Sequence, residues 1–403
     1  MRSVKRLSSL LTVVLLSALG GMADPDGTGA LALTLLAPKD YQVVQRDSRT
    51  QGRVVVAGTL RLAAGQTLPP DRLEARLTGK SMAGNLPATW QSISFDASSA
   101  SFHDELTVPA GGWYRLEVRV SQGGQWVATN AVEHVGVGEV FVIAGQSNSA
   151  NYGEEKQKTA TGLVSAFDGS GWQPAADPEP GASGKRGSFL PVFGDAIAEQ
   201  FRVPVGLVPM GIGSTSVREW LPAGIRFTNP PTLTRNVVTV APGQWEATGK
   251  IFSSFAARMK QFGPHGFRAV LWHQGESDAR QAEPQCTLPG ERYHEYLGRV
   301  IRDSRREIGW AAPWFVAQVS YHNPGDTSSP EIRAAQQALW DEGVALAGPD
   351  TDTLTGAMRE KNGQGIHLSA QGLREHGRLW AAKVSPWLEK ELEDKQTGAN
   401  GRE

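Results

Sequence analysis

Short apolar runs recur through the second part of the chain. They are Val140–Ala144, Val205–Met210, Ala269–Trp272 and Trp314–Val319. A strand without polar alternation is typically buried on both faces, as in a parallel sheet that helices cover. Helix-like segments lie between the runs, so strands and helices alternate. The pattern predicts an α/β layered domain over residues 138–390, with its ligand crevice at the carboxyl ends of the strands.

Residues 31–137 have a different pattern of apolar and polar residues. Short strand-like runs, several alternating apolar with polar residues, are separated by Gly, Pro, Asn and Asp. Strands of this length and spacing predict a small antiparallel β-sandwich, and nothing in the stretch looks catalytic. Residues 391–403 are charged and then rich in Gly and Asn, which predicts a flexible tail.

The first 23 residues have the features of a secretory signal. Arg2, Lys5 and Arg6 precede an apolar run at residues 10–19, and Gly21-Met22-Ala23 supplies small residues for cleavage. The run is too short to cross a bilayer as a retained helix, and no second apolar stretch is long enough to do so. The sequence therefore predicts export, to the periplasm or the medium.

Charge and cysteine content exclude several classes of protein. The chain has 40 Lys and Arg against 41 Asp and Glu, so broad attraction to nucleic acid or an anionic membrane is not expected. Cys286 is the sole cysteine, which rules out an intrachain disulfide. It stands in a loop-like stretch with nothing to lower its thiol pKa, which argues against a cysteine nucleophile.

Polar clusters follow three of the buried strands. They are Gly145-Gln146-Ser147-Asn148, the loop around Gly213-Ser214-Thr215, and His273-Gln274-Gly275-Glu276-Ser277-Asp278. Near the end of the chain, His367 precedes a helix-like segment. Each segment alone also fits an ordinary turn, helix cap or packed histidine. Together they place a serine and a histidine base at one edge of a sheet, as a serine hydrolase requires.

These four blocks, in this order, resemble the SGNH hydrolase superfamily. They are most similar to its sialate O-acetylesterase-like branch, which includes acetylxylan esterases. The likeness covers roughly residues 139–388, and the preceding segment resembles the accessory β domain of that branch. The resemblance implies a three-layer α/β/α esterase domain that acts on acetylated carbohydrate and needs no metal and no organic cofactor.

The resemblance also implies roles for individual residues. Ser147 would attack the acetyl carbonyl, and His367 would take and return the proton. The oxyanion would be held by the N–H of Ser147, a backbone N–H near Gly213, and the side chain of Gln274.

Two positions depart from the family pattern. The usual acid lies three residues before the histidine, where this chain has Gln364, and a neutral amide cannot stabilise an imidazolium as a carboxylate does. Glu276 is the predicted replacement, with Asp278 second, because both belong to the third polar block. Ser214 stands where relatives usually have glycine, and its side chain could narrow the acyl pocket or leave the oxyanion loop unchanged.

Three aromatic residues are candidates for substrate binding. Trp220, Trp272 and Tyr321 could stack on sugar rings, although most tryptophans near a sheet pack in the core.

The missing acid at Gln364 leaves open a second function, that of a non-catalytic carbohydrate-binding protein. A lipid or peptide hydrolase is a second rival, but residues 229–248 are rich in Pro, Thr and Asn and do not form an apolar lid. Sialic acid, xylan and other acetylated glycans all fit the catalytic blocks.

Overall fold

The computed structural model describes residues 31–61 and 69–400. The predicted signal segment, residues 1–23, lies outside them, as do residues 401–403 of the predicted tail. Residues 391–400 are not an irregular tail, because they continue helix α6 (Ala370–Asn400). The sequence after Glu389 is rich in the helix-forming residues Glu, Leu and Lys. Leu392 is fully buried in the core beside the sheet, and this packing holds the helix together beyond residue 390.

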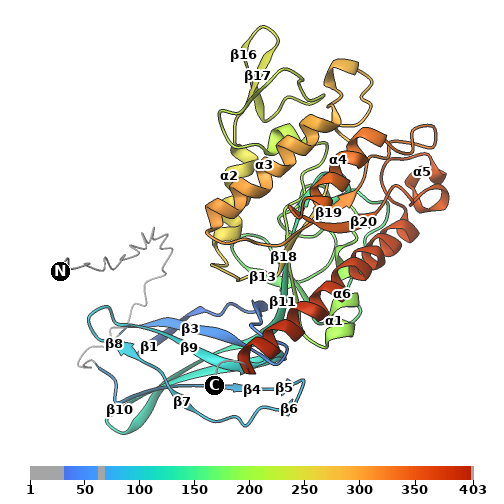
Figure 1. The fold of residues 1–403 in the computed structure, drawn as a ribbon. Helices are drawn as coiled ribbons and strands as arrows, with labels where there is room; N and C mark the ends of the chain where they lie inside the picture. Colours follow the sequence, from blue (N-terminus) through green and yellow to red (C-terminus); the bar gives the residue numbers. More distant parts are fainter. Residues whose placement is uncertain (1–30, 62–68, 401–403) are drawn as a thin grey trace.

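A parallel sheet forms the centre of the second part of the chain (Figure 1). Its strands lie in the order β12, β14, β11, β18, β19, β20, and β13 pairs antiparallel at the edge beside β12. Their bounds are β11 (Gln125–Gly145), β12 (Val164–Phe167), β13 (Trp172–Pro174), β14 (Val205–Pro209), β18 (Ala269–His273), β19 (Trp314–Gln318) and β20 (Leu346–Asp350). The chain builds outward from β11 in both directions, which makes the end of β11 the switch point where ligands bind in such sheets.

Helices cover both faces of this sheet, as the apolar runs predicted. On one face α1 (Leu190–Phe201) packs with α6, and on the other lie α2 (Lys250–Lys260), α3 (Gly290–Ile308) and α4 (Pro330–Asp341). Alternate residues of strand β11 belong to the two hydrophobic cores on opposite faces of the sheet. Val140, Val142 and Ala144 pack in one core, and Phe141 and Ile143 pack in the other. Burial on both faces is the physical reason why this strand has no polar alternation.

The first part of the chain is antiparallel. One sheet contains β1 (Ala32–Ala37), β3 (Gln51–Arg61), β9 (Ser101–Pro109) and β8 (Phe95–Asp96). The other contains β4 (Arg72–Thr78), β5 (Lys80–Ser81), β6 (Gly84–Asn85), β7 (Gln91–Ser92), β10 (Gly111–Gln122) and the start of β11, with β2 (Gln42–Gln45) parallel to β11. Both contribute to one apolar core that includes Val54, Leu106 and Val118.

Strand β11 joins the two parts without a linker. It pairs with β10 through residues 125–137 and with β14 and β18 through residues 139–145. At the junction the buried Glu139 carboxylate binds Arg46 and Arg268, each at 2.6 Å. Division into independent units at residue 137 therefore stays a prediction, because the proposed boundary falls inside a continuous strand.

Smaller elements surround the carboxyl ends of the parallel strands. They are η1 (Ser147–Ser149), η2 (Val217–Trp220), η3 (Pro284–Cys286), η4 (Gly356–Met358), α5 (Glu360–Gly363), and a sheet of β15 (Arg226–Phe227), β17 (Gln244–Ala247) and β16 (Val237–Ala241). Within the described residues, no helix has the length and apolarity needed to span a membrane.

Candidate active site

Ser147 begins a tight turn directly after β11. Gly145 has φ +128°, and a Cβ there would lie 2.1 Å from the His273 carbonyl oxygen on the neighbouring strand β18. The N–H of Gln146 donates to the same carbonyl at 2.9 Å. Only glycine permits this close approach. The turn therefore places Ser147, which is 4% exposed, at the carboxyl edge of the sheet beside β18.

The turn also presents unpaired backbone donors. Within η1, the N–H of Ser149 donates to Gln146 and that of Ala150 to Ser147. In the part of the chain that the structure describes, the N–H groups of Ser147 and Asn148 have no acceptor. Free N–H groups beside a nucleophile can stabilise a developing oxyanion, which agrees with the role expected for the Ser147 N–H.

His367 is held by a carboxylate, that of Glu360. The distance from His367 Nδ1 to Glu360 Oε1 is 2.9 Å. Because a carboxylate only accepts, Nδ1 carries the proton in this bond, and the lone pair of Nε2 is left to act as a base. Glu360 Oε2 accepts from Arg186 at 3.1 Å, and the Glu360 N–H donates to the His367 carbonyl at 2.9 Å.

The acid stands seven residues before the histidine because the intervening chain makes a left-handed turn. Lys361 and Asn362 both have φ +55°, and Gly363 has φ +87°. Their turn brings Glu360 back against the His367 ring and leaves Gln364 without this role. Glu360 is not among the site residues predicted from the sequence. The signal that could have found it is that Glu360 is the one carboxylate between Thr353 and His367.

The serine turn and the histidine loop are bonded to each other. Asn148 Nδ2 donates to the carbonyl of Ile366 at 3.2 Å, and the Glu154 N–H donates to the carbonyl of Leu368 at 2.9 Å. The ring of Tyr152 stacks on His367 with 5.5 Å between centroids. The fold therefore brings the turn that holds Ser147 and the loop that holds His367 together, although the two are far apart in sequence.

The electrostatics suit a base. Burial lowers the pKa of His367 below its ordinary value, and the adjacent Glu360 carboxylate opposes that shift only in part. Burial alone would raise the pKa of Glu360, but its pairing with His367 and Arg186 holds that pKa below the ordinary value. At neutral pH this leaves an ionised acid and a neutral imidazole, the protonation states that serine hydrolysis requires.

Comparison with known proteins identifies the family. The family model for "carbohydrate esterase, sialic acid-specific acetylesterase" matches residues 137–385, more than half of the chain. The chain belongs to this family. It is therefore a carboxylic ester hydrolase, a carbohydrate O-acetyl esterase. No curated protein sequence matches it significantly.

Comparison with solved structures finds several that are similar to this chain. A carbohydrate acetylesterase from Xanthomonas citri is 19% identical, with TM-score 0.50, over 87% of this chain and 73% of that one. A protein from Arabidopsis thaliana is 19% identical, with TM-score 0.43, over 61% and 98% of the two chains. A family 2 carbohydrate esterase from Clostridium thermocellum, in complex with cellohexaose, is 12% identical, with TM-score 0.35, over 86% and 90%.

The prediction that Glu276 or Asp278 orients His367 in this esterase is wrong. Glu276 Oε1 accepts from Asn148 Nδ2 at 2.9 Å, and burial raises the pKa of Glu276 to about 7. Asp278 accepts from Ser216 and the Val217 N–H and forms a buried ion pair with Arg218 at 3.0 Å. Glu276 therefore contacts the histidine loop only through Asn148, whose Nδ2 also donates to the Ile366 carbonyl, and Asp278 is bonded to the segment 216–218.

Two of the predicted oxyanion donors are already bonded within the protein. The N–H of Gly213 donates to Ser183 Oγ at 2.7 Å. The Gln274 amide is fully buried, and its Nε2 lies 2.6 Å from Asp278 Oδ2 and 3.2 Å from the Thr215 carbonyl. The structure thus corrects the expectation for Gln274, because the third polar block turns inward to pack against the glycine loop.

Ser214 has an unusual backbone conformation for its residue type. Its φ is +61°, in the left-handed region that glycine adopts without steric cost. This explains physically why a glycine is expected at this position. The exposed Ser214 side chain lines a pocket of about 320 Å³ together with Ser216, Ser277, His322 and Ile366, the residue before His367. The Ser214 side chain therefore faces this pocket, and its effect on the acyl pocket stays a prediction.

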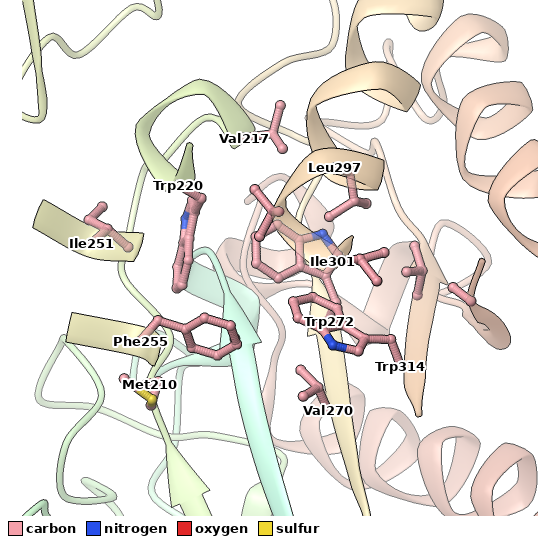
Figure 2. Packing of buried hydrophobic residues seen from close by; sticks show 14 of the residues in the cluster. Met210, Val217, Trp220, Ile251, Phe255, Val270, Trp272, Leu297, Ile301 and Trp314 are labelled. Carbon is pink, nitrogen blue, oxygen red and sulfur yellow. The ribbon is translucent and has the colours of Figure 1, made fainter. Parts of the chain in front are cut away.

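The two tryptophans expected to bind substrate do not reach the surface. Trp220 and Trp272 are both 0% exposed, and their rings meet edge to face with 5.0 Å between centroids. Figure 2 shows them packed among Phe255, Ile301 and Trp314 beneath the site. Tyr321 is also buried, with the Arg359 guanidinium over its ring. Their large apolar area fills the layer between the sheet and α2 and α3, so they support the site rather than line it.

The single cysteine is not placed for chemistry. Cys286 is buried in η3, and burial raises the pKa of its thiol. A thiol that holds its proton is a poor nucleophile. Across the described residues, no group of three or more His, Cys, Asp or Glu side chains could hold a metal ion.

Proposed function

We propose that this esterase removes acetyl groups from carbohydrate through an acetyl-enzyme formed on Ser147. The observation that carries the proposal is the hydrogen bond from His367 to Glu360, in a loop bonded to the turn that holds Ser147. A carboxylate, a neutral imidazole and a serine at a sheet edge are the parts that this chemistry needs.

The reaction has two steps. In the first, Ser147 Oγ bonds to the acetyl carbon while His367 Nε2 takes its proton, and the proton then passes to the sugar oxygen as the ester bond breaks. In the second, water gives a proton to His367 and attacks the acetyl carbon, and Ser147 regains the proton as acetate leaves. The N–H of Ser147 stabilises the oxyanion in both steps.

Several observations favour a sugar over a lipid chain. Apart from Pro231, Leu233 and Ile366, the pocket beside the site is lined by hydroxyl, amide and imidazole side chains and by the Glu276 carboxylate. The non-catalytic alternative was supported by the amide at Gln364, and Glu360 removes that support. The substrate is therefore an acetylated glycan, with sialic acid and xylan as the two candidates to compare first.

Acetate release tests this function. We expect acetate from 4-nitrophenyl acetate and, with a higher kcat/KM, from O-acetylated sialic acid or acetylated xylan, because the hydroxyl and amide groups that line the pocket can hydrogen-bond to a sugar. The octanoate ester of 4-nitrophenol serves as the matched lipid-like substrate and should be cleaved poorly. A fluorophosphonate probe should label the peptide that contains Ser147. Faster cleavage of the octanoate, or no acetate from any sugar, would contradict the proposal.

We also propose that the esterase acts outside the cytoplasm. The support is the charged and apolar pattern of residues 1–23 with its small-residue site. Expressed with its own N-terminus, the protein should be recovered from the periplasm or medium with Asp24 as its first residue, as intact-mass spectrometry would report. Recovery of the uncleaved chain in the cytoplasm would refute export.

A further inference from the structure

Ser183 is fixed between the serine turn and the glycine loop. Its N–H donates to the Gly211 carbonyl at 2.9 Å, and its carbonyl accepts from the Asn151 N–H at 3.0 Å. Gly184, the next residue, bridges to Asn151, and the Arg186 N–H donates to the Asn151 carbonyl at 2.9 Å. The backbone alone thus positions Ser183, and its partly exposed side chain is free for another purpose.

The Ser183 hydroxyl accepts a hydrogen bond, but its own proton has no acceptor among the described residues. It accepts from the Gly213 N–H at 2.7 Å. A serine hydroxyl also carries one proton to donate, and the described residues offer no acceptor for it. Accepting a hydrogen bond polarises the O–H group and makes it a stronger donor.

This hydroxyl belongs to the same site as the base. A Cβ added to Gly213 would lie 2.4 Å from the ring of Tyr152, and that ring stacks on His367. A Cβ added to Gly211 would lie 2.5 Å from Ser149 Oγ in the serine turn. The Ser183–Gly213 pair therefore lies beside Tyr152, whose ring stacks on His367, and its loop packs against the serine turn.

We propose that the Ser183 hydroxyl is an oxyanion donor of this esterase. It donates its hydrogen bond to the acetyl carbonyl oxygen as that oxygen becomes negative, and the Gly213 N–H strengthens it from behind. The proton stays on Ser183 throughout. The proposal rests on the Ser147 mechanism proposed above, and it assigns to the Ser183 side chain the role that was expected of a backbone N–H near Gly213.

Ser183→Ala and Ser183→Thr test the proposal. Losing one oxyanion donor costs about 10²-fold in kcat, so we expect Ser183→Ala to lower kcat by roughly 10- to 100-fold, because the freed Gly213 N–H compensates in part. KM should change little, since the bond strengthens only in the transition state. Affinity for a boronic acid, which forms a tetrahedral adduct on serine, should fall by a similar factor. Ser183→Thr keeps the hydroxyl and should retain most activity.

Three results would overturn the proposal. An unchanged or higher kcat in Ser183→Ala would mean that the hydroxyl only caps Gly213. Equal losses in Ser183→Ala and Ser183→Thr would assign the effect to packing, and thermal unfolding of both variants checks for misfolding. A wild type that releases no acetate would remove the proposed function itself, and this outcome differs from a loss confined to Ser183→Ala.

Discussion

Replacing Ser147 with alanine should lower kcat for acetate release by about 10⁶-fold, because the loss of a serine nucleophile removes the covalent route entirely. Residual hydrolysis should come from binding and the backbone donors alone. The fold should survive, since the turn is set by Gly145 and by backbone hydrogen bonds to His273. Initial rates on 4-nitrophenyl acetate, with thermal unfolding measured in parallel, check both expectations.

Cys286→Ser is the matched control for this variant. It changes the other side chain that could form an acyl-enzyme, and it should keep wild-type kcat because the buried thiol takes no part. Loss of activity in Cys286→Ser at unchanged stability, together with an active Ser147→Ala, would reassign the nucleophile.

Replacing Glu360 with glutamine should lower kcat by roughly 10³- to 10⁴-fold. The amide can donate to His367 Nδ1, which favours the tautomer with the proton on Nε2 and leaves no lone pair facing the serine. The Glu360 carboxylate also raises the pKa of His367 against the larger lowering by burial. Its removal should therefore shift the acid limb of the kcat/KM profile, which reports the pKa of His367, to lower pH than in the wild type.

The Glu276→Gln variant tests whether Glu360 or Glu276, the residue predicted from the sequence, is the carboxylate that orients His367. Glutamine keeps an oxygen to accept from Asn148, so kcat should stay within about tenfold of the wild type and the acid limb should not move. A pH–rate series of the wild type and both variants makes the comparison. A larger loss in Glu276→Gln than in Glu360→Gln would restore Glu276 as the partner of the base.

The amino-acid sequence determined the architecture and the main chemical groups of this esterase. Apolar runs indicate strands that are buried on both faces. Parallel strands place their carboxyl ends at one edge of the sheet, so the polar blocks at Ser147, Gly213 and His273 are expected to lie at that edge. The family match confirms the resemblance that those blocks carried. The roles of Ser147 and His367 stay predictions with geometric support.

Only the tertiary structure decided which side chains contact each other. The acid of the site depends on two left-handed residues, Lys361 and Asn362, and a lysine gives no sequence signal of that conformation. The tryptophans were ambiguous because large aromatic rings fill cores and bind sugars with the same apolar faces. Ser183 reaches the glycine loop through hydrogen bonds between segments distant in sequence, a contact set by packing rather than by spacing.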